Sequence, residues 1–358
     1  ILVEAGELPA ADSPRSSSLE YRVYPPYPKA WWDMAFESEQ ENARQFQLLR
    51  QSRLLMESDG QRSGIPQGIL SDRYNAQRNL ANIVGDGAIF SHLNGNDAEA
   101  TGRILDCLNM ANCIGQNHTL VAQLVAMGIS ALSEVTTEIV APSLRVGDGP
   151  KDIVRQNVRQ LITELADEKP VRTDLANTLK FELPSMFSGT PRSAKSAHIT
   201  RAGIQRDEPL LVKASELENL PTSLALIAKG DWPRGAETLD RIFITEFRIL
   251  ADRRMAAIAL AAQLYRADHK LQWPAKLEQL VPAYLPSVPS DPYRKDNAEV
   301  GYKIIPHGWP DGRDRPVVYV DSGPDVQVGS EPLIGWQIRG RKMVRQYRDL
   351  SSPREAVK

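Results

Sequence analysis

Apolar residues recur at helical spacing along residues 74–141, and this pattern constrains the fold more than any other feature of the chain. Residues three or four apart share one face of a helix, so a sustained apolar stripe indicates a helix that packs against others. The stripe residues are Leu80, Ile83, Val84, Gly87, Ile104, Leu105, Leu108, Ala111, Leu120, Leu124, Val125, Gly128, Ala131, Leu132 and Val135. The pattern predicts three packed helices, with Leu105, Leu108, Leu124 and Leu132 meeting in their core.

The first two of these helices are separated by a short turn, Asn-Gly-Asn-Asp. Gly95 suits a helix end and Asp97 suits an N-cap, and so short a connection makes the two helices antiparallel neighbours. We expect the small residues Gly87, Gly102 and Gly128 to let helices approach closely. This arrangement predicts a tetratricopeptide-like helical hairpin, with one copy in the chain and no fixed repeat period.

Helix-forming residues dominate four further segments, so the expected fold class is mainly α, a helical-hairpin array. The expected helices span residues 31–57, 152–167, 173–179 and 235–269. The last of them has the broadest apolar face. Trp31 and Trp32 begin the first, where the pair acts either as an interaction platform or as an anchor that holds the helix to its own core.

Three short strand-like runs follow the longest helix, at residues 301–305, 316–321 and 333–338, separated by Pro, Gly and Asp turns. They predict a small C-terminal α+β module of antiparallel strands. The expected organisation is therefore an extended linker or strap at 1–30, a helical domain at 31–234, the long helix and β module at 235–335, and a basic tail at 336–358. A polar excursion near 183–207 interrupts the helical domain and is either a partner-binding loop or surface decoration.

The charge balance excludes strong attraction to polyanions, because 43 basic and 45 acidic residues leave a net charge of −2. No nucleic-acid partner is expected. The longest uninterrupted apolar run, residues 256–262, is too short for a membrane helix. The first residue is Ile1, and a signal or anchor helix before it is the only membrane attachment that we expect.

Local motifs for catalysis or metal binding are missing from the sequence. The five histidines form no metal-binding pair, and Cys107 and Cys113 point to different helix faces. Nucleophile-elbow, phosphate-loop and dinucleotide motifs are also missing. An enzyme would therefore need a site assembled from residues that lie far apart in the chain.

Residues 256–325 resemble the C-terminal part of a type II secretion major pseudopilin and of related uncharacterised bacterial envelope proteins. The matching segments are 264–269, 273–282, 284–286, 291–293, 301–303 and 318–325. They follow the family's order: a helix that stops at a proline, a short helix, an Asp-Pro-Tyr turn, and strands that end in a motif similar to Ser-x-Gly-x-Asp-Gly. The resemblance implies an architecture more than an activity.

Pseudopilins of this type bind calcium in the loop after the final strands, so the resemblance implies Asp321 and Asp325 as calcium ligands, with Asp311 and Asp314 in the preceding turn. Calcium needs six to eight oxygen ligands, and residues 326–330 supply no further carboxylate. The alternative is that these aspartates form and cap turns. We expect no other cofactor.

The tail carries seven basic and two acidic residues, a local charge of +5. Arg341, Lys342 and Arg345 are its candidate interaction residues, for an acidic partner or for lipid headgroups. The alternative is a solvated terminal helix.

These features favour a non-enzymatic scaffold or accessory subunit of the bacterial cell envelope, periplasmic or membrane-tethered, that binds protein partners or forms a homo-oligomer. The alternative function is a hydrolase or ligand-binding protein whose site is assembled from distant residues.

Overall fold

The computed structural model describes residues 27–53, 67–186, 209–230, 237–307 and 314–320, and three short strands between residues 338 and 349. The protein is mainly helical with small antiparallel sheets, as predicted. The longer helices are α1 (Lys29–Glu41), α2 (Ala43–Ser52), α3 (Gln67–Leu93), α4 (Asp97–Gly115), α5 (Leu120–Val140), α6 (Ile153–Ala166), α7 (Lys169–Met186), α9 (Leu220–Ile227) and α10 (Glu237–Asp268). Two 3₁₀ turns, η1 (Ala141–Ser143) and η2 (Leu277–Leu280), follow α5 and α10.

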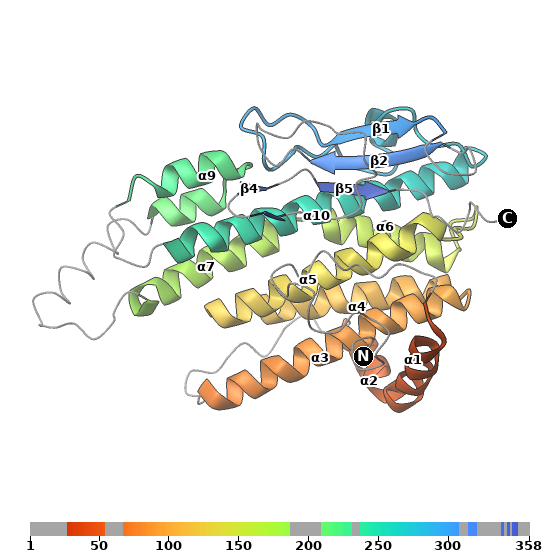
Figure 1. Ribbon diagram of the computed structural model, residues 1–358, viewed down its shortest axis with the longest axis horizontal. Coiled ribbons are helices and arrows are strands. Elements are labelled where there is room, and N and C mark those ends of the chain that lie inside the picture. The colour runs from red at the N-terminus through yellow and green to blue at the C-terminus, as the bar shows by residue number, and fades with distance from the viewer. Residues whose placement is uncertain are drawn as a thin grey trace, which may run out of the picture.

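The long helices lie side by side, from α3 at one edge to α10, and the β-sheet lies beyond α10 (Figure 1). The α1–α2 pair packs against α3 and α4, on the side of the helical layer that lies away from the β-sheet. Helix α10 connects the helical layer to the sheet, because it contacts α5 and α6 and also β2, β5 and η2. Its Phe243, Phe247 and Leu250 are almost fully buried. The apolar face predicted for residues 235–269 is therefore the core of the fold.

The turn between α3 and α4 has the predicted length but a different cap. Gly95 has a φ of +83°, the left-handed conformation that glycine tolerates best. The N-cap of α4 is Asn96, whose side chain accepts a hydrogen bond from the backbone N–H of Glu99 at 3.1 Å. The prediction of Asp97 as the cap was wrong, because its carboxylate is used by His92 and by the backbone of Arg145.

The single helix predicted for residues 31–57 is two helices, with a break at Asn42. The Asn42 side chain donates to the carbonyl oxygen of Ser38 at 2.9 Å, which competes with continued helix formation. The short helix predicted at 173–179 is the middle of the longer helix α7.

Helix α5 buries most of its circumference, because α3, α4, α7 and α10 all contact it. Its buried positions include the polar residues Gln123, Ser130, Ser133, Glu134, Thr136, Thr137 and Glu138. Several of these groups are satisfied inside the helix itself. The hydroxyls of Ser133 and Thr137 donate to carbonyl oxygens four residues earlier, and Ser130 donates to the Glu134 carboxylate at 2.8 Å. These three hydroxyl groups can therefore be buried at little cost.

The outward stripe of α5 is apolar as a consequence. Val121 and Leu124 are 50% and 46% exposed, and a side chain at Gly128 would meet open space. Leu105 and Leu108 are buried as predicted, but the prediction that Leu124 packs with them was wrong. Gly128 also provides no close helix approach. Of the stripe predicted for this helix, Leu124 and Gly128 are exposed, Val125 is buried, and Leu120, Ala131, Leu132 and Val135 are half-buried.

Residues Leu120–Ser143, which form α5 and η1, are long and apolar enough to cross a membrane, judged by length and composition alone. They are the one such helix within the described ranges, and 67% of the apolar window is buried inside the protein. A core helix also passes this test, so the burial favours a packing role.

The C-terminal module contains two of the predicted antiparallel strands, and the third, predicted at 333–338, lies outside the described residues up to 337. β1 (Gly301–Ile305) pairs with β2 (Arg315–Val320), and Tyr302 lies opposite Val318. β2 also pairs with β5 (Gln346–Asp349), so the sheet extends beyond residue 335 into the segment expected to be a basic tail. A separate ribbon joins β3 (Ile338–Arg339) and β4 (Lys342–Met343).

Candidate functional site

The two predicted interface tryptophans belong largely to the core. Trp31 is 2% exposed and stacks on Tyr27 with ring centroids 4.2 Å apart. Trp32 is partly buried and lies 5.7 Å from the ring of Phe90. Of the two roles considered for the pair, anchoring α1 to its own core fits these contacts, and only part of Trp32 reaches the surface.

The other predicted site residues lie at the edge of the described chain or beyond it. Arg341, Arg345, Asp321 and Asp325 fall outside the described residues, and Lys342 is described only as part of strand β4. The basic patch and the calcium site therefore stay predictions.

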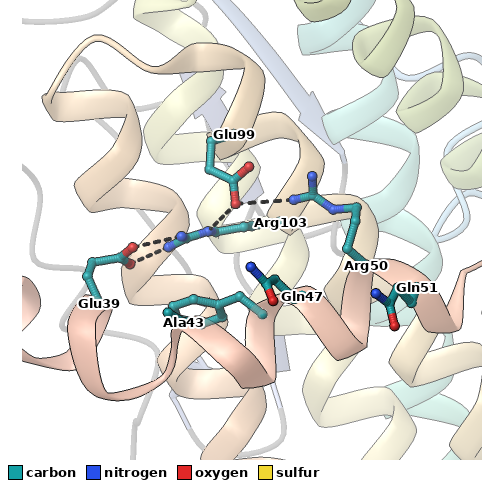
Figure 2. A pocket seen from close by; sticks show the side chains of 8 residues that line it. Glu39, Ala43, Gln47, Arg50, Gln51, Glu99 and Arg103 are labelled. Carbon is teal, nitrogen blue, oxygen red and sulfur yellow. Dashed lines mark hydrogen bonds and ion pairs between the residues drawn. The ribbon is translucent and has the colours of Figure 1, made fainter.

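A charged groove of about 350 Å³ lies between the α1–α2 pair and α4 (Figure 2). Arg103 is its centre. The guanidinium of Arg103 forms a bidentate ion pair with Glu39, with an Nη2–Oε2 distance of 2.7 Å, and also donates to Glu99 at 2.8 Å. It stacks 4.1 Å above the ring of Phe46. Arg50 reaches the same Glu99 carboxylate from α2.

The network continues into the interior through Asp106, which is 2% exposed. Its carboxylate accepts from Arg50 at 3.0 Å and from Arg53 at 2.8 Å. Burial raises the pKa of Asp106, and the attraction of the two guanidinium groups only partly offsets that effect. The three arginines and three carboxylates of the groove balance each other, so this groove is a clamp that holds the α1–α2 pair on α4.

Two glycines make room for this clamp. A side chain on Gly87 would place its Cβ 2.7 Å from Glu39 Oε1, and one on Gly102 would place it 2.8 Å from Arg50 Nη2. Both glycines thus allow close approach, as predicted, but the groups that approach are charged side chains rather than whole helices.

Two buried carboxyl groups lie where α7 meets α10 and α5. Glu246 is 2% exposed, and neither of its oxygens has a hydrogen-bond partner within the described residues. Burial raises the pKa of Glu246 to about 8, against the attraction of Arg172 and Arg253. Burial alone raises the pKa of Asp174 to about 6. Asp174 lines a cavity of about 20 Å³, room for one water molecule and too small for an organic substrate.

The structure also brings together a serine, a histidine and an aspartate that the sequence did not identify as a set. His92 lies in the last turn of α3, Asp97 begins α4, and Ser143 ends the η1 turn after α5. His92 Nδ1 lies 2.6 Å from Asp97 Oδ1, and His92 Nε2 lies 2.8 Å from Ser143 Oγ. His92 and Asp97 are buried, at 7% and 4% exposed, and Ser143 is half-buried.

The protonation of this group follows from Asp97. Burial alone would raise the pKa of Asp97, but hydrogen bonds from His92 and from the backbone N–H of Arg145, at 2.9 Å, hold it below its ordinary value. An ionised carboxylate only accepts hydrogen bonds, so His92 Nδ1 carries a proton. In the neutral ring, the other nitrogen of His92, Nε2, is then an acceptor, and the Ser143 hydroxyl donates a hydrogen bond to it.

No group of three or more metal-binding side chains occurs within the described ranges. No family model matches the chain, and comparisons with curated proteins and with solved structures return no significant match. Any function must therefore be argued from the chain's own surfaces and side chains.

Replacing Arg103 by Met should destabilise the protein by about 2–4 kcal/mol, because Glu39 would stay partly buried without its cation and Glu99 would keep only Arg50. Urea unfolding measures the change, and hydrogen exchange should locate faster opening in α1. The control is Lys29→Met, which removes a solvent-exposed ion pair with Asp33 and should leave the unfolding midpoint unchanged. Equal effects of the two substitutions would contradict the clamp.

Replacing Glu246 by Gln should stabilise the protein increasingly as the pH rises. The unfolded carboxyl ionises near pH 4.5, whereas the folded one keeps its proton up to about pH 8, so burial of Glu246 costs stability progressively across this interval. The variant should match the parent near pH 4.5 and exceed it by on the order of 3 kcal/mol at pH 8. Exposed Glu278→Gln is the control, and a constant difference at all pH values would show that Glu246 is ionised in the fold.

Proposed function

We propose that the protein is a scaffold or accessory subunit of the bacterial cell envelope that contacts other proteins through its helical array. The observation that carries this proposal is the outward stripe of α5, where Val121, Leu124 and Gly128 offer an apolar surface to solvent. Clustered exposed apolar residues of this kind mark contact surfaces more often than isolated ones do.

The two grooves favour a function in binding other proteins over a function in binding a small substrate. The groove at Arg103 is filled with ion pairs that the chain supplies itself. A second groove, of about 400 Å³, is lined by Arg254, which is paired with Glu168 and with Glu218. In both, the guanidinium groups are already occupied. We propose that the array of α3, α4 and α5 acts as a tetratricopeptide-like hairpin unit, whose partner is another protein or a second copy of this chain.

The location at the envelope rests on the resemblance of residues 256–325 to the pseudopilin module and its relatives. The order of a long helix, a 3₁₀ turn and strands β1 and β2 supports that resemblance. In this proposal the protein is periplasmic or tethered by a segment before Ile1, and Arg341, Lys342 and Arg345 dock on an acidic partner. Calcium at Asp321 and Asp325 is the one cofactor that the resemblance suggests.

A photo-crosslinking amino acid at position 124 tests the contact. In cells that make the full chain, it should give one discrete adduct of defined mass, either a dimer or a complex with one partner, and Val121→Asp should abolish it. The same crosslinker at Ile153, which is 60% exposed on α6, is the matched control and should give no discrete adduct. Equal adduct patterns at both positions would contradict a specific contact on α5.

The alternative function, a hydrolase with a site assembled from distant residues, also has one specific observation in its favour. It is the hydrogen-bonded set of Ser143, His92 and Asp97.

A further inference from the structure

Three separate segments supply Ser143, His92 and Asp97, and the topology brings these segments to one end of the array. Because α4 runs antiparallel to both α3 and α5, the end of α3, the start of α4 and the end of α5 lie at the same end. Ser143 and His92 are 51 residues apart in the chain, yet only 2.8 Å separates Oγ from Nε2.

The geometry meets the requirements for an activated serine. The hydroxyl lies within hydrogen-bond distance of a histidine nitrogen that can accept its proton, and the carboxylate of Asp97 fixes the other nitrogen. Asp97 is itself held by the backbone N–H of Arg145. The imidazole is buried, which holds it in one orientation, while Ser143 is half-buried.

Arg145 adds a positive charge next to this serine. Its side chain is 70% exposed, and its Nε lies 3.4 Å from Asp97 Oδ2. A Cβ on Gly95 would come within 2.7 Å of Arg145 Nη2, so the absence of a side chain at Gly95 gives the guanidinium its place over the turn. A guanidinium there would attract an anionic group of a substrate.

We propose that Ser143 is a nucleophile for acyl transfer, with His92 as its general base and Asp97 as a positioning residue, and that its substrates are small carboxylic esters that carry a negative charge. This activity goes beyond the contact-making function and does not depend on the outward stripe of α5.

The reaction has two steps. Ser143 Oγ attacks the ester carbonyl carbon and gives its proton to His92 Nε2, and the ester C–O bond breaks as that proton passes to the leaving alkoxide. Water then attacks the acyl-serine and gives one proton to Nε2, which returns it to Oγ as the carboxylic acid leaves.

A fluorophosphonate probe tests the nucleophile directly, because Oγ displaces fluoride and stays bonded to phosphorus. With the full chain, we expect about one adduct per molecule, located on Ser143 by peptide mass spectrometry, and none in Ser143→Ala. Ser52→Ala is the matched control, since Ser52 is also half-buried but donates only to a backbone carbonyl oxygen at 2.7 Å. That variant should react like the parent.

The positioning role of Asp97 needs a kinetic readout. Asp97→Asn should lower the maximal labelling rate by on the order of 100-fold or more, while the probe concentration for half-maximal rate stays unchanged. Cleavage of the p-nitrophenyl monoester of succinate should exceed that of p-nitrophenyl acetate, and Arg145→Gln should remove the difference.

An adduct on another serine, or no adduct in the folded parent chain, would overturn the proposal. Mapping the adduct in the parent decides the question even if a variant fails to fold. A discrete crosslink at position 124 without any labelling of Ser143 would leave the contact function standing and refute the acyl-transfer activity alone.

Discussion

Hydrogen bonds between hydroxyl side chains and carbonyl oxygens one turn earlier determine how α5 sits in the structure. They give the hydroxyls of Ser133 and Thr137 an acceptor within α5 itself when both residues enter the core. Burial of a polar group is costly only when its hydrogen bonds are lost, so these two hydroxyls are buried at little cost. Val121 and Leu124 are then left at the surface.

Two other buried polar groups, on Arg103 and His92, are satisfied by specific partners from distant segments. Arg103 joins α4 to α1 through Glu39, and His92 joins α3 to the end of α5 through Ser143. Each such pair fixes the position of one element relative to another, because a buried charge or ring nitrogen without its partner would be costly. Glu246 differs from these, since its buried carboxyl has no hydrogen-bond partner among the described residues and keeps its proton instead.

Much of the helical framework could be predicted from the sequence, because helix positions depend on local spacing. The apolar face of residues 235–269 correctly predicted helix α10, and Gly95 correctly predicted the turn between α3 and α4. The orientation of α5 could not be predicted, because it depends on four helices that enclose it. The break at Asn42 depends on one side-chain hydrogen bond, for which the composition of residues 31–57 gives no indication.

The candidate site was hidden from the sequence for a topological reason. A histidine in the last turn of a helix and an aspartate five residues later are common at turns, and Ser143 joins them only once α3 and α5 run parallel. A search that placed residues at the shared ends of alternate helices would have found it. The sequence alone identifies Trp31 and Trp32 as an aromatic pair at the start of a helix. Whether they face the core or a partner is decided by their contacts with Tyr27 and Phe90.

Helix α5 is oriented with Val121 and Leu124 toward solvent, and carbene footprinting of the native protein tests this orientation most directly. Side chains that meet solvent should be labelled, so Val121 and Leu124 should be modified strongly. Met127 and Ile129, at 3% and 2% exposed, should stay protected until the protein is unfolded. Strong labelling of Met127 and Ile129 with protection of Val121 and Leu124 would mean that the apolar stripe faces the core, and would contradict the account.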